Sequence, residues 1–179
     1  MRPVTNLMKI NLRVDATQSR VIDAVAAVLG FELPTTSNSS SNRGSSSCLW
    51  LGPDEWLIVK TGSHPDDLAQ RLASAVSLGW GSVVDVSDHY AVLELSGPEA
   101  PQVISHGCSL DTHARRWPLG ACAQTLLAHM QVILHHVAPG PTFHVYVRRS
   151  LADYVVTWLL DASVEYRGLA MDALSQASA

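Results

Sequence analysis

Histidine is the residue type with the widest choice of chemistry in this sequence, and three of its eight histidines lie close together. His135 and His136 end one apolar segment, and His144 follows after the turn at 139–141. Consecutive residues on a strand point to opposite faces, so His135 and His136 cannot both reach one metal ion. With the turn centred on Gly140, His136 is expected opposite His144, close enough to share a ligand or a proton. Sheet histidines more often bond to backbone or partner groups, so we predict no metal site and leave their role open.

Cysteine could also supply a metal ligand, and the chain has three: Cys48, Cys108 and Cys122. An odd, widely spaced set does not predict a disulfide framework. Cys108 with His106 and His113 could form a loop cluster, but their spacing matches no known zinc pattern. We therefore expect no metal at this cluster either.

A nucleophile could be built from Cys122 with His129 or His136. A reactive thiol needs an electropositive, accessible setting. Cys122 instead lies in the segment GACAQT, at the start of a predicted strand, where a small buried residue is equally suitable. We expect no catalytic role for it.

Hydroxyl and carboxylate groups give no self-sufficient site. Ser87, Asp88 and His89 are adjacent, without the Gly-x-Ser-x-Gly turn that exposes a serine nucleophile. Asp85 and Glu94 lie near strand ends, where an acid could hold an amine or a pterin-like heterocycle or could simply solvate a turn. Neither a Gly-x-Gly-x-x-Gly segment nor a phosphate-binding Gly-Lys-Ser/Thr loop is present. The sequence thus predicts no catalytic residue, and cofactor-binding residues stay unknown.

Composition narrows the class of protein. The chain has 179 residues, of which 47% are hydrophobic and 16% charged, below the roughly 25% of ordinary domains. Together with five Trp, this suggests that a partner covers part of the surface. The net charge of −4 and the lack of a basic tract argue against nucleic-acid binding. No apolar run reaches the roughly 18 residues of a membrane span, and no signal peptide is apparent, so we expect a cytoplasmic protein.

The elements of the first half follow from periodicity and from turn residues. Residues 7–15 alternate between apolar and polar types, which predicts a strand. Asp15 or Thr17 is expected to cap a helix that runs to about Leu29 and ends at Gly30. The other elements predicted here are strands at 48–52 and 56–60 and a helix that opens at 65–67.

The stretch 120–162 carries the clearest pattern, with strands at 130–137 and 143–148 after a first strand. Ser150 and Asp153 have the spacing of a capping box, which predicts a helix starting at Ser150. Its buried face is expected to comprise Leu151, Tyr154, Val155, Trp158, Leu159 and Ala162. Further elements predicted upstream are strands at 82–86 and 91–95 and a helix at 99–105.

This order of elements predicts an α+β fold with a mainly antiparallel sheet, helices packed on its faces and two ferredoxin-like halves. We expect one compact unit over 1–179, with halves at 1–78 and 79–168 and a tail at 169–179. The Ser- and Asn-rich segment 34–47 is expected to be a flexible surface loop, because it has little apolar area to bury.

Several segments together resemble one family, the gamma subunits of heterotetrameric sarcosine oxidase. In family order they are LWLGPDEWL (49–57), VDVSD (84–88), LSG (95–97), CSLD (108–111), GACAQT (120–125) and VRRS with ADY (147–154). The resemblance implies a fold similar to the folate-binding aminomethyltransferases. GACAQT also resembles a segment of free-standing folate-binding repair proteins, but it lacks a second Gly and a Glu.

The resemblance also implies a function and partners. Such complexes oxidise sarcosine to glycine, with hydrogen peroxide and a one-carbon unit as the other products. The alpha and beta subunits are expected to carry FAD, FMN, NAD and the tetrahydrofolate site, and the delta subunit zinc. The gamma subunit is expected to bind no cofactor and to serve as a structural subunit in contact with alpha.

Two alternatives stay open at this point. The chain could bind folate or act as an aminomethyltransferase-like enzyme alone, with Asp85 or Glu94 facing the pterin. It could instead be a metal protein that uses His136 and His144. For the subunit reading, Arg148, Arg149 and Trp158 are expected to contact a partner or the loop at 115–117.

Overall fold

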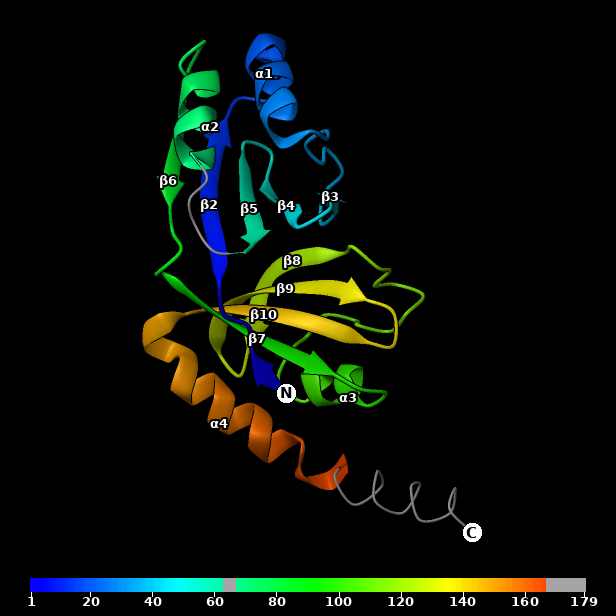
Figure 1. Cartoon of the computed structure of the whole chain (residues 1–179). Helices are drawn as coiled ribbons and strands as arrows, with labels where there is room; N and C mark the ends of the chain where they lie inside the picture. The colour runs from blue at the N-terminus through cyan, green and yellow to red at the C-terminus, as the bar shows by residue number, and fades with distance from the viewer. Residues whose placement is uncertain (63–66, 167–179) are drawn as a thin grey trace.

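Figure 1 shows the computed structural model of the chain, which describes residues 1–62 and 67–166. The first of its two sheets has five antiparallel strands in the order β3-β4-β5-β2-β6. Without β3, these strands and two helices form the β-α-β-β-α-β unit of ferredoxin-like folds. The elements are β2 (Leu7–Val14), α1 (Ser19–Leu29), β3 (Ser40–Arg43), β4 (Ser46–Gly52), β5 (Glu55–Thr61), α2 (Leu68–Val76) and β6 (Gly81–Asp85).

The second sheet, in the order β1-β7-β10-β9-β8, is also antiparallel. Its outermost strand next to β7 comes from the N-terminus of the chain, so β1 occupies the place of the last strand of a second ferredoxin-like unit. The elements are β1 (Arg2–Pro3), β7 (Tyr90–Ser96), α3 (Ala100–Ser105), β8 (Cys122–Leu127), β9 (Met130–Ala138), β10 (Thr142–Arg148), the 3₁₀ turn η1 (Arg149–Leu151) and α4 (Ala152–Ala162).

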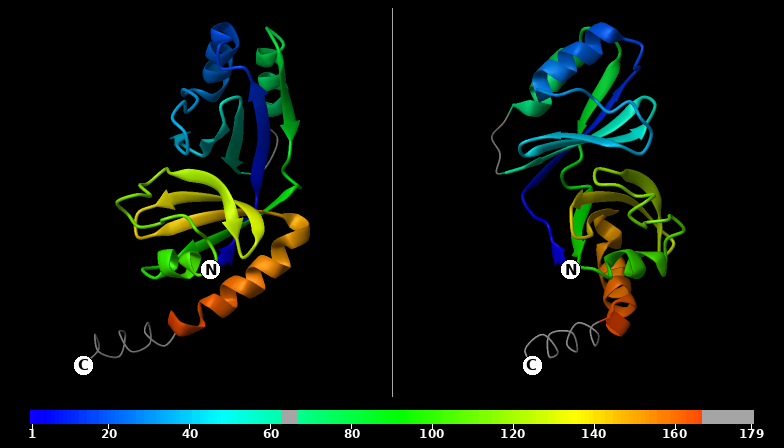
Figure 2. Two further views of the ribbon diagram at one scale, coloured as in Figure 1. Left: turned by 180° about the vertical axis from the view of Figure 1, so that it is seen from behind. Right: turned by 90° about the vertical axis from the view of Figure 1, so that its right-hand side faces the viewer.

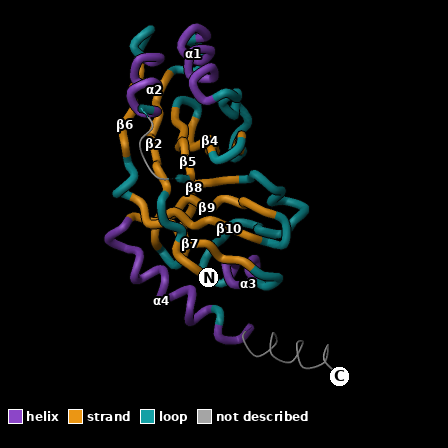
Figure 3. The backbone as a smooth tube through the Cα atoms, in the orientation of Figure 1, coloured by secondary structure: helices purple, strands orange, loops and turns teal. Residues whose placement is uncertain are grey.

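The elements stack as helices, sheet, sheet and helices. Helices α1 and α2 lie at one end of the molecule, α3 and α4 at the other, and the strands fill the middle (Figures 2 and 3). Three apolar clusters match this order: one under α1 and α2, one between the sheets and one under α3 and α4. The expected α+β fold with two ferredoxin-like halves is confirmed.

Alternation along β2 shows why both sheet faces are buried. Ile10 and Leu12 point to the helices, as the pattern predicted. Leu7 and Lys9 point to the opposite face, yet both are buried because the second sheet covers that face. Helix α1 ends as expected at Gly30, which has a φ of +80° and donates its N–H to the carbonyl of Ala26.

Helix starts differ from the predictions. The capping box at Ser150 and Asp153 does not form, because Ser150 lies inside the η1 turn and α4 begins at Ala152 without a side-chain cap. Likewise α1 begins at Ser19, and Asp15 instead accepts hydrogen bonds from the N–H and hydroxyl of Thr17.

The segment 34–47, predicted to be a flexible loop, is ordered in the structure. It contains β3 and the start of β4, which pair as a hairpin. The bonds that order it are polar: the Ser40 hydroxyl donates to the carbonyl of Gly120, and the N–H of Cys122 donates to the carbonyl of Asn38. A criterion based on apolar burial alone cannot detect such bonds across the chain.

The first sheet extends to Asp85, beyond the expected boundary at 78, since β6 pairs with β2. Two predictions lie outside the described residues: the tail at 169–179 and the opening of α2 at 65–66.

Candidate functional site

A cavity of about 500 Å³ opens at one end of the contact between the two sheets. Neither lysine, arginine nor a carboxylate belongs to its described lining, which mixes uncharged polar and apolar side chains. The polar part of the lining includes Ser40, Asn42, Ser47, His135, His144 and Tyr146. Three of the predicted histidines, His135, His136 and His144, belong to the lining of this cavity.

The register of the β9–β10 hairpin decides which histidines meet. His135, not His136, lies opposite His144, and His136 lies opposite Phe143. The predicted register is wrong by one residue because the ladder shifts between Thr142 and Phe143. A shift of one residue moves a side chain to the other face, so the side chain of His136 lies on the face opposite that of His144, although both residues line the cavity.

His135 is buried on the face of the second sheet that meets the first sheet, and its hydrogen bonds determine which ring nitrogen carries the proton. Its Nε2 lies 3.1 Å from the hydroxyl oxygen of Ser40, and that hydroxyl donates its own hydrogen to the carbonyl of Gly120. Nε2 must therefore be the N–H donor, which leaves Nδ1 as a bare acceptor. Nδ1 is buried and has no hydrogen-bond partner within the described structure. Burial lowers the pKa of His135 to about 3, so the ring is neutral near pH 7.

His144 contacts the carboxylate of Glu94, which also accepts a hydrogen bond from Arg2. Its Nε2 lies 3.5 Å from Oε2 of Glu94, whose Oε1 receives the Nε–H of Arg2 at 2.7 Å. The hydrogen bond from Arg2 holds the pKa of Glu94 below its ordinary value. Burial lowers the pKa of His144, and the contact with Glu94 opposes that shift.

These contacts do not fit a folate site of the expected kind. Glu94 is engaged by Arg2 and His144 and does not line the cavity. Asp85 accepts the N–H of Ser87 at 2.8 Å and lies outside the cavity lining as well. No acid is therefore presented to the donor edge of a pterin in the described cavity, and we assign no step to folate here.

His136 belongs to the outer face of the second sheet. It stacks on Phe143 with ring centroids 5.0 Å apart. Its Nδ1 lies 3.2 Å from the carbonyl oxygen of Trp117, so Nδ1 carries the proton. These contacts give His136 a role in packing the loop before β8.

The surroundings of Cys122 make its thiol unreactive. Its side chain is fully buried between the sheets, and Sγ lies 3.2 Å from the carbonyl oxygen of Ser39. Burial raises the pKa of the thiol to about 11, which disfavours the thiolate that a nucleophile requires. His129 is exposed in the β8–β9 turn, and His136 is on the other face, so neither forms the pair considered from the sequence.

The loop cluster does not come together either. Cys108 Sγ contacts the hydroxyl of Thr125 at 3.6 Å, and His106 contacts the hydroxyl of Tyr166 at 2.8 Å. His113 accepts the N–H of Arg115. Across residues 1–62 and 67–166, the structure contains no group of three or more His, Cys, Asp or Glu that could hold a metal ion.

Ser87, Asp88 and His89 form the crossing from the first sheet to the second. The Ser87 hydroxyl accepts the N–H of Lys9, and the N–H of His89 donates to Val86. Asp88 pairs with Arg149 at 3.5 Å. These are turn contacts, and the three side chains do not form a catalytic triad.

For Arg148, Arg149 and Trp158, the structure gives contacts other than those expected with the loop at 115–117, and the expected contacts with a partner stay a prediction. Arg149 donates to the carbonyl of Asp88, and Arg148 lines a separate surface pocket. Trp158 packs against Gly107. None of the described contacts of these residues reaches the loop at 115–117, whose Trp117 is buried under the second sheet.

Sequence reasoning missed Ser40 and Tyr146 as lining residues of the cavity. Ser40 lies in the segment taken for a flexible loop, and Tyr146 looked like an ordinary alternating strand residue. Only the hairpin β3–β4 and the second sheet bring them together, and local periodicity carries no signal of that contact.

Known proteins of one family resemble this chain over most of its length. The model of the family "Sarcosine oxidase, gamma subunit family" matches residues 13–165. The chain belongs to the sarcosine oxidase gamma subunit family. It is 37% identical over 144 residues to the sarcosine oxidase subunit gamma of Arthrobacter sp., covering 80% of this chain and 70% of the relative. The family expected from the sequence motifs is confirmed.

Two solved structures support the family and the fold. A chain of the heterotetrameric sarcosine oxidase from Corynebacterium sp. U-96 matches with a TM-score of 0.86 and 31% identity, covering 92% of this chain and 83% of that one. The aminomethyltransferase T of the Bartonella henselae glycine cleavage system matches with a TM-score of 0.63 and 11% identity, covering 88% and 44%. The second match shows the shared fold alone.

These matches favour the gamma-subunit reading over a stand-alone folate enzyme. Among the described helices, none is long and apolar enough to cross a membrane.

Proposed function

We propose that this gamma-family chain is a structural subunit of a heterotetrameric sarcosine oxidase. The observation that carries the proposal is its similarity, over 92% of its length, to a chain of a solved complex of that kind. In this complex sarcosine would lose its N-methyl group to give glycine, in an oxidation whose two electrons pass to molecular oxygen. Hydrogen peroxide and a one-carbon unit, formaldehyde or 5,10-methylenetetrahydrofolate, would be the other products.

The division of labour within the complex is part of the proposal. The alpha subunit would contact this chain directly, and the beta and delta subunits would complete the tetramer. FAD, FMN, NAD and tetrahydrofolate would be bound by the other subunits. The side chains of this chain support a structural role, because Cys122 is held as a buried thiol and Glu94 is engaged by Arg2. The cytoplasmic location stays a prediction.

Co-expression tests assembly. The chain would be produced with the alpha, beta and delta subunits of the same organism, with an affinity tag on alpha. We expect this chain to co-purify in equal amount with the flavin-containing subunits, and sarcosine-dependent hydrogen peroxide formation to fall when it is omitted. Purification of an active flavin complex without this chain would reject the proposal.

A second experiment tests the structural role. The Cys122→Ala and His135→Gln variants would be assembled into the complex separately. We expect kcat for sarcosine to stay within about twofold of wild type, since neither group is placed to react. A loss of a hundredfold or more in an intact, flavin-loaded tetramer would show that this chain supplies a catalytic group.

A further inference from the structure

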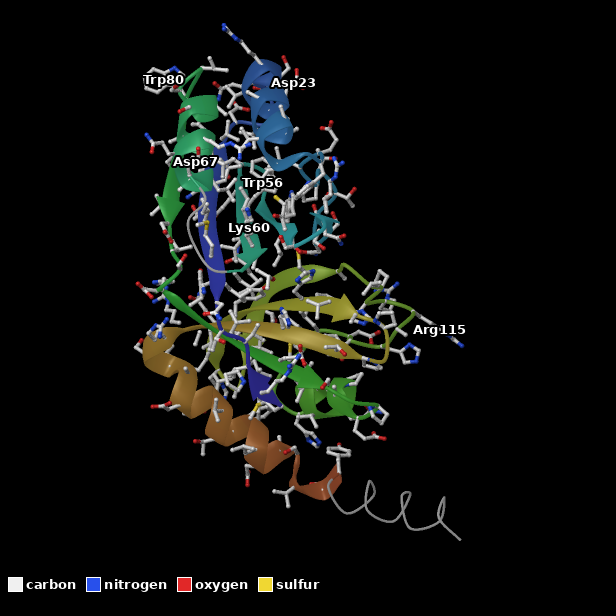
Figure 4. All side chains as sticks on the ribbon, in the orientation of Figure 1. Asp23, Trp56, Lys60, Asp67, Trp80 and Arg115 are labelled. Atoms are coloured by element: carbon white, nitrogen blue, oxygen red, sulfur yellow. The ribbon has the colours of Figure 1, made fainter. Side chains whose placement is uncertain are left out.

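Trp80 is the most exposed of the large hydrophobic side chains in the described chain, with 86% of its surface accessible. It lies between α2 and β6 and projects from one end of the molecule (Figure 4). A tryptophan so exposed leaves on the order of 200 Å² of largely apolar surface in water. That is about a quarter of the ~800 Å² that each partner contributes to a standard protein interface.

The backbone around Trp80 is held tightly, so the exposure is built into the fold. The side-chain amide of Gln18 clamps the residue: Nε2 donates to the carbonyl of Trp80 at 2.9 Å, and Oε1 accepts its N–H at 2.9 Å. A Cβ on Gly79 would collide with Gln18 Oε1 and lie 2.7 Å from Val21 Cγ2.

The glycine on the other side is equally constrained. A Cβ on Gly81 would lie 2.5 Å from the carbonyl oxygen of Arg13 and 2.8 Å from Val76 Cγ1. With both neighbours pressed against α1, α2 and β2, only the side chain of Trp80 points outward. A rigidly presented aromatic residue is the usual anchor of an interface, because it loses little conformational entropy on binding.

Strand β6 next to Trp80 is an edge of the first sheet, and among the described strands it pairs with β2 alone. The N–H of Val86 donates to the carbonyl of Lys9, which fixes the ladder. In an antiparallel pair the bonded residues alternate, so Ser82 and Val84 bond to β2 while Gly81 and Val83 turn their N–H and C=O groups away from it. Soluble proteins protect such an edge with charges, proline or a cover.

Exposed apolar side chains lie at this edge beside the polar Ser82 and the charged Asp85. Leu78 is 46% exposed and Val84 is 50% exposed. We call the surface formed by Leu78, Trp80, Val84 and the outward backbone of Gly81 and Val83 the β6 edge.

The charges next to Trp80, where β2 ends and the β4–β5 turn lies, indicate the charge of a partner that binds there. A shallow groove along Trp80 is lined by two carboxylates, Asp15 and Asp54, and by one cation, Arg13. Arg13 is already paired with Asp54 at 3.3 Å. Hydrogen bonds from the N–H and hydroxyl of Thr17 lower the pKa of Asp15, which keeps it anionic. The groove thus carries a net negative charge and favours a basic side chain.

We infer that the β6 edge is the docking site for an extended strand of the alpha subunit. That strand would continue the first sheet beyond β6, receive the indole of Trp80 in an apolar pocket and place a lysine or arginine beside Asp15. This inference rests on the proposed function, since it names the surface that joins the chain to its complex.

The test compares two exposed apolar residues at opposite ends of the molecule. Trp80→Ser and, as a matched control, Leu160→Ser on α4 (43% exposed) would each be co-expressed with the alpha, beta and delta subunits. We expect Trp80→Ser to reduce co-purification with tagged alpha at least tenfold and Leu160→Ser to leave it unchanged. Thermal unfolding of each isolated variant, expected within a few degrees of wild type, confirms folding.

Hydrogen exchange tests the strand pairing without a substitution. The amides of Gly81 and Val83 should exchange at least tenfold more slowly in the complex than in the isolated chain. Co-purification of Trp80→Ser at the wild-type level, or unprotected amides at Gly81 and Val83, would overturn the inference. The inference would also be wrong if Trp80 makes the isolated chain self-associate while the tetramer assembles without Trp80.

Different experimental outcomes would reject the proposed function and the proposed docking site. If the wild-type chain does not join the complex at all, the proposed function is wrong. If it joins and Trp80→Ser joins equally well, the function stands and the β6 edge is not the docking site.

Discussion

At the scale of single residues, the three histidines of one hairpin have three different surroundings. His135 donates to Ser40, His136 donates to the carbonyl of Trp117, and His144 lies beside Glu94. Each ring is oriented by a neighbour from a different part of the chain. Their closeness in sequence therefore says little about shared chemistry, and the face of the sheet decides which of them can meet.

The neutral ring of His135 predicts a specific loss of stability in acid. An unfolded histidine takes up a proton below its ordinary pKa of about 6.5, whereas folded His135 resists until the pH nears about 3. The stabilisation is therefore complete above about pH 6.5 and is lost as the pH falls toward 3, by up to about 1.4 kcal/mol per pH unit. Urea unfolding between about pH 7 and pH 5 should show a shallower decline for His135→Gln than for wild type.

His89→Gln is the matched control, since His89 is exposed at the crossing between the sheets. Its free energy of unfolding should decline with pH as steeply as that of wild type. Equal slopes for His135→Gln and wild type would mean that the buried ring accepts a proton in the folded state.

At the scale of elements, periodicity located most strands and helices, because alternating and helical patterns report which face is buried. The pattern FHVYVR identified β10, but it could not reveal the irregularity between Thr142 and Phe143 that sets the register. The capping prediction at Ser150 failed for a similar reason, since η1 occupies the first turn. Local sequence favours an element, while its neighbours in space fix its end and its register.

The hairpin β3–β4 is an element that the local sequence failed to predict. Its residues carry few apolar side chains, so composition favoured a loop. The hydrogen bonds from Ser40 to Gly120 and from Cys122 to Asn38 join it to the second sheet. The wall of the candidate cavity that this hairpin forms could therefore not be predicted from the sequence, because it depends on a contact between distant segments.

Helix α4 provides a test of element packing at Gly107. A Cβ on this glycine would lie 2.6 Å from two ring atoms of Trp158, so Gly107→Ala forces the indole or the helix to shift. We expect a loss of about 1–3 kcal/mol in the free energy of unfolding, measured with urea. Ser105→Ala, at the exposed end of α3, should cost much less.

The contact with Trp158 can be isolated in a double-mutant cycle. Trp158→Phe removes the ring atoms that collide, so Gly107→Ala should cost less in that background, with a coupling of at least about 0.5 kcal/mol. Additive costs would show that the strain at Gly107 lies elsewhere, for example against the N–H of Ala128 at 3.0 Å.

At the scale of the whole molecule, the N-terminal end of the chain contributes a strand to the second sheet. Strand β1 precedes the first sheet in sequence and pairs with β7 of the second, where Arg2 holds Glu94. A strand of two residues has no periodicity, so this pairing of β1 with β7 could not be predicted from the sequence. Together with the buried cluster between the sheets, it makes separation of the halves costly.

This coupling predicts that the described halves unfold as one unit, and two matched core truncations can test it. Leu72 in α2 and Leu134 in β9 are both almost fully buried, but they lie in the outer clusters of different halves. Leu72→Ala should lower the free energy of unfolding by about 2–5 kcal/mol. If unfolding is cooperative, the slowest-exchanging amides of β9 should lose protection by the same amount, and Leu134→Ala should do the same to β5. Loss confined to the mutated half would show that each sheet opens by itself, with the inner cluster too weak to bind them into one folding unit.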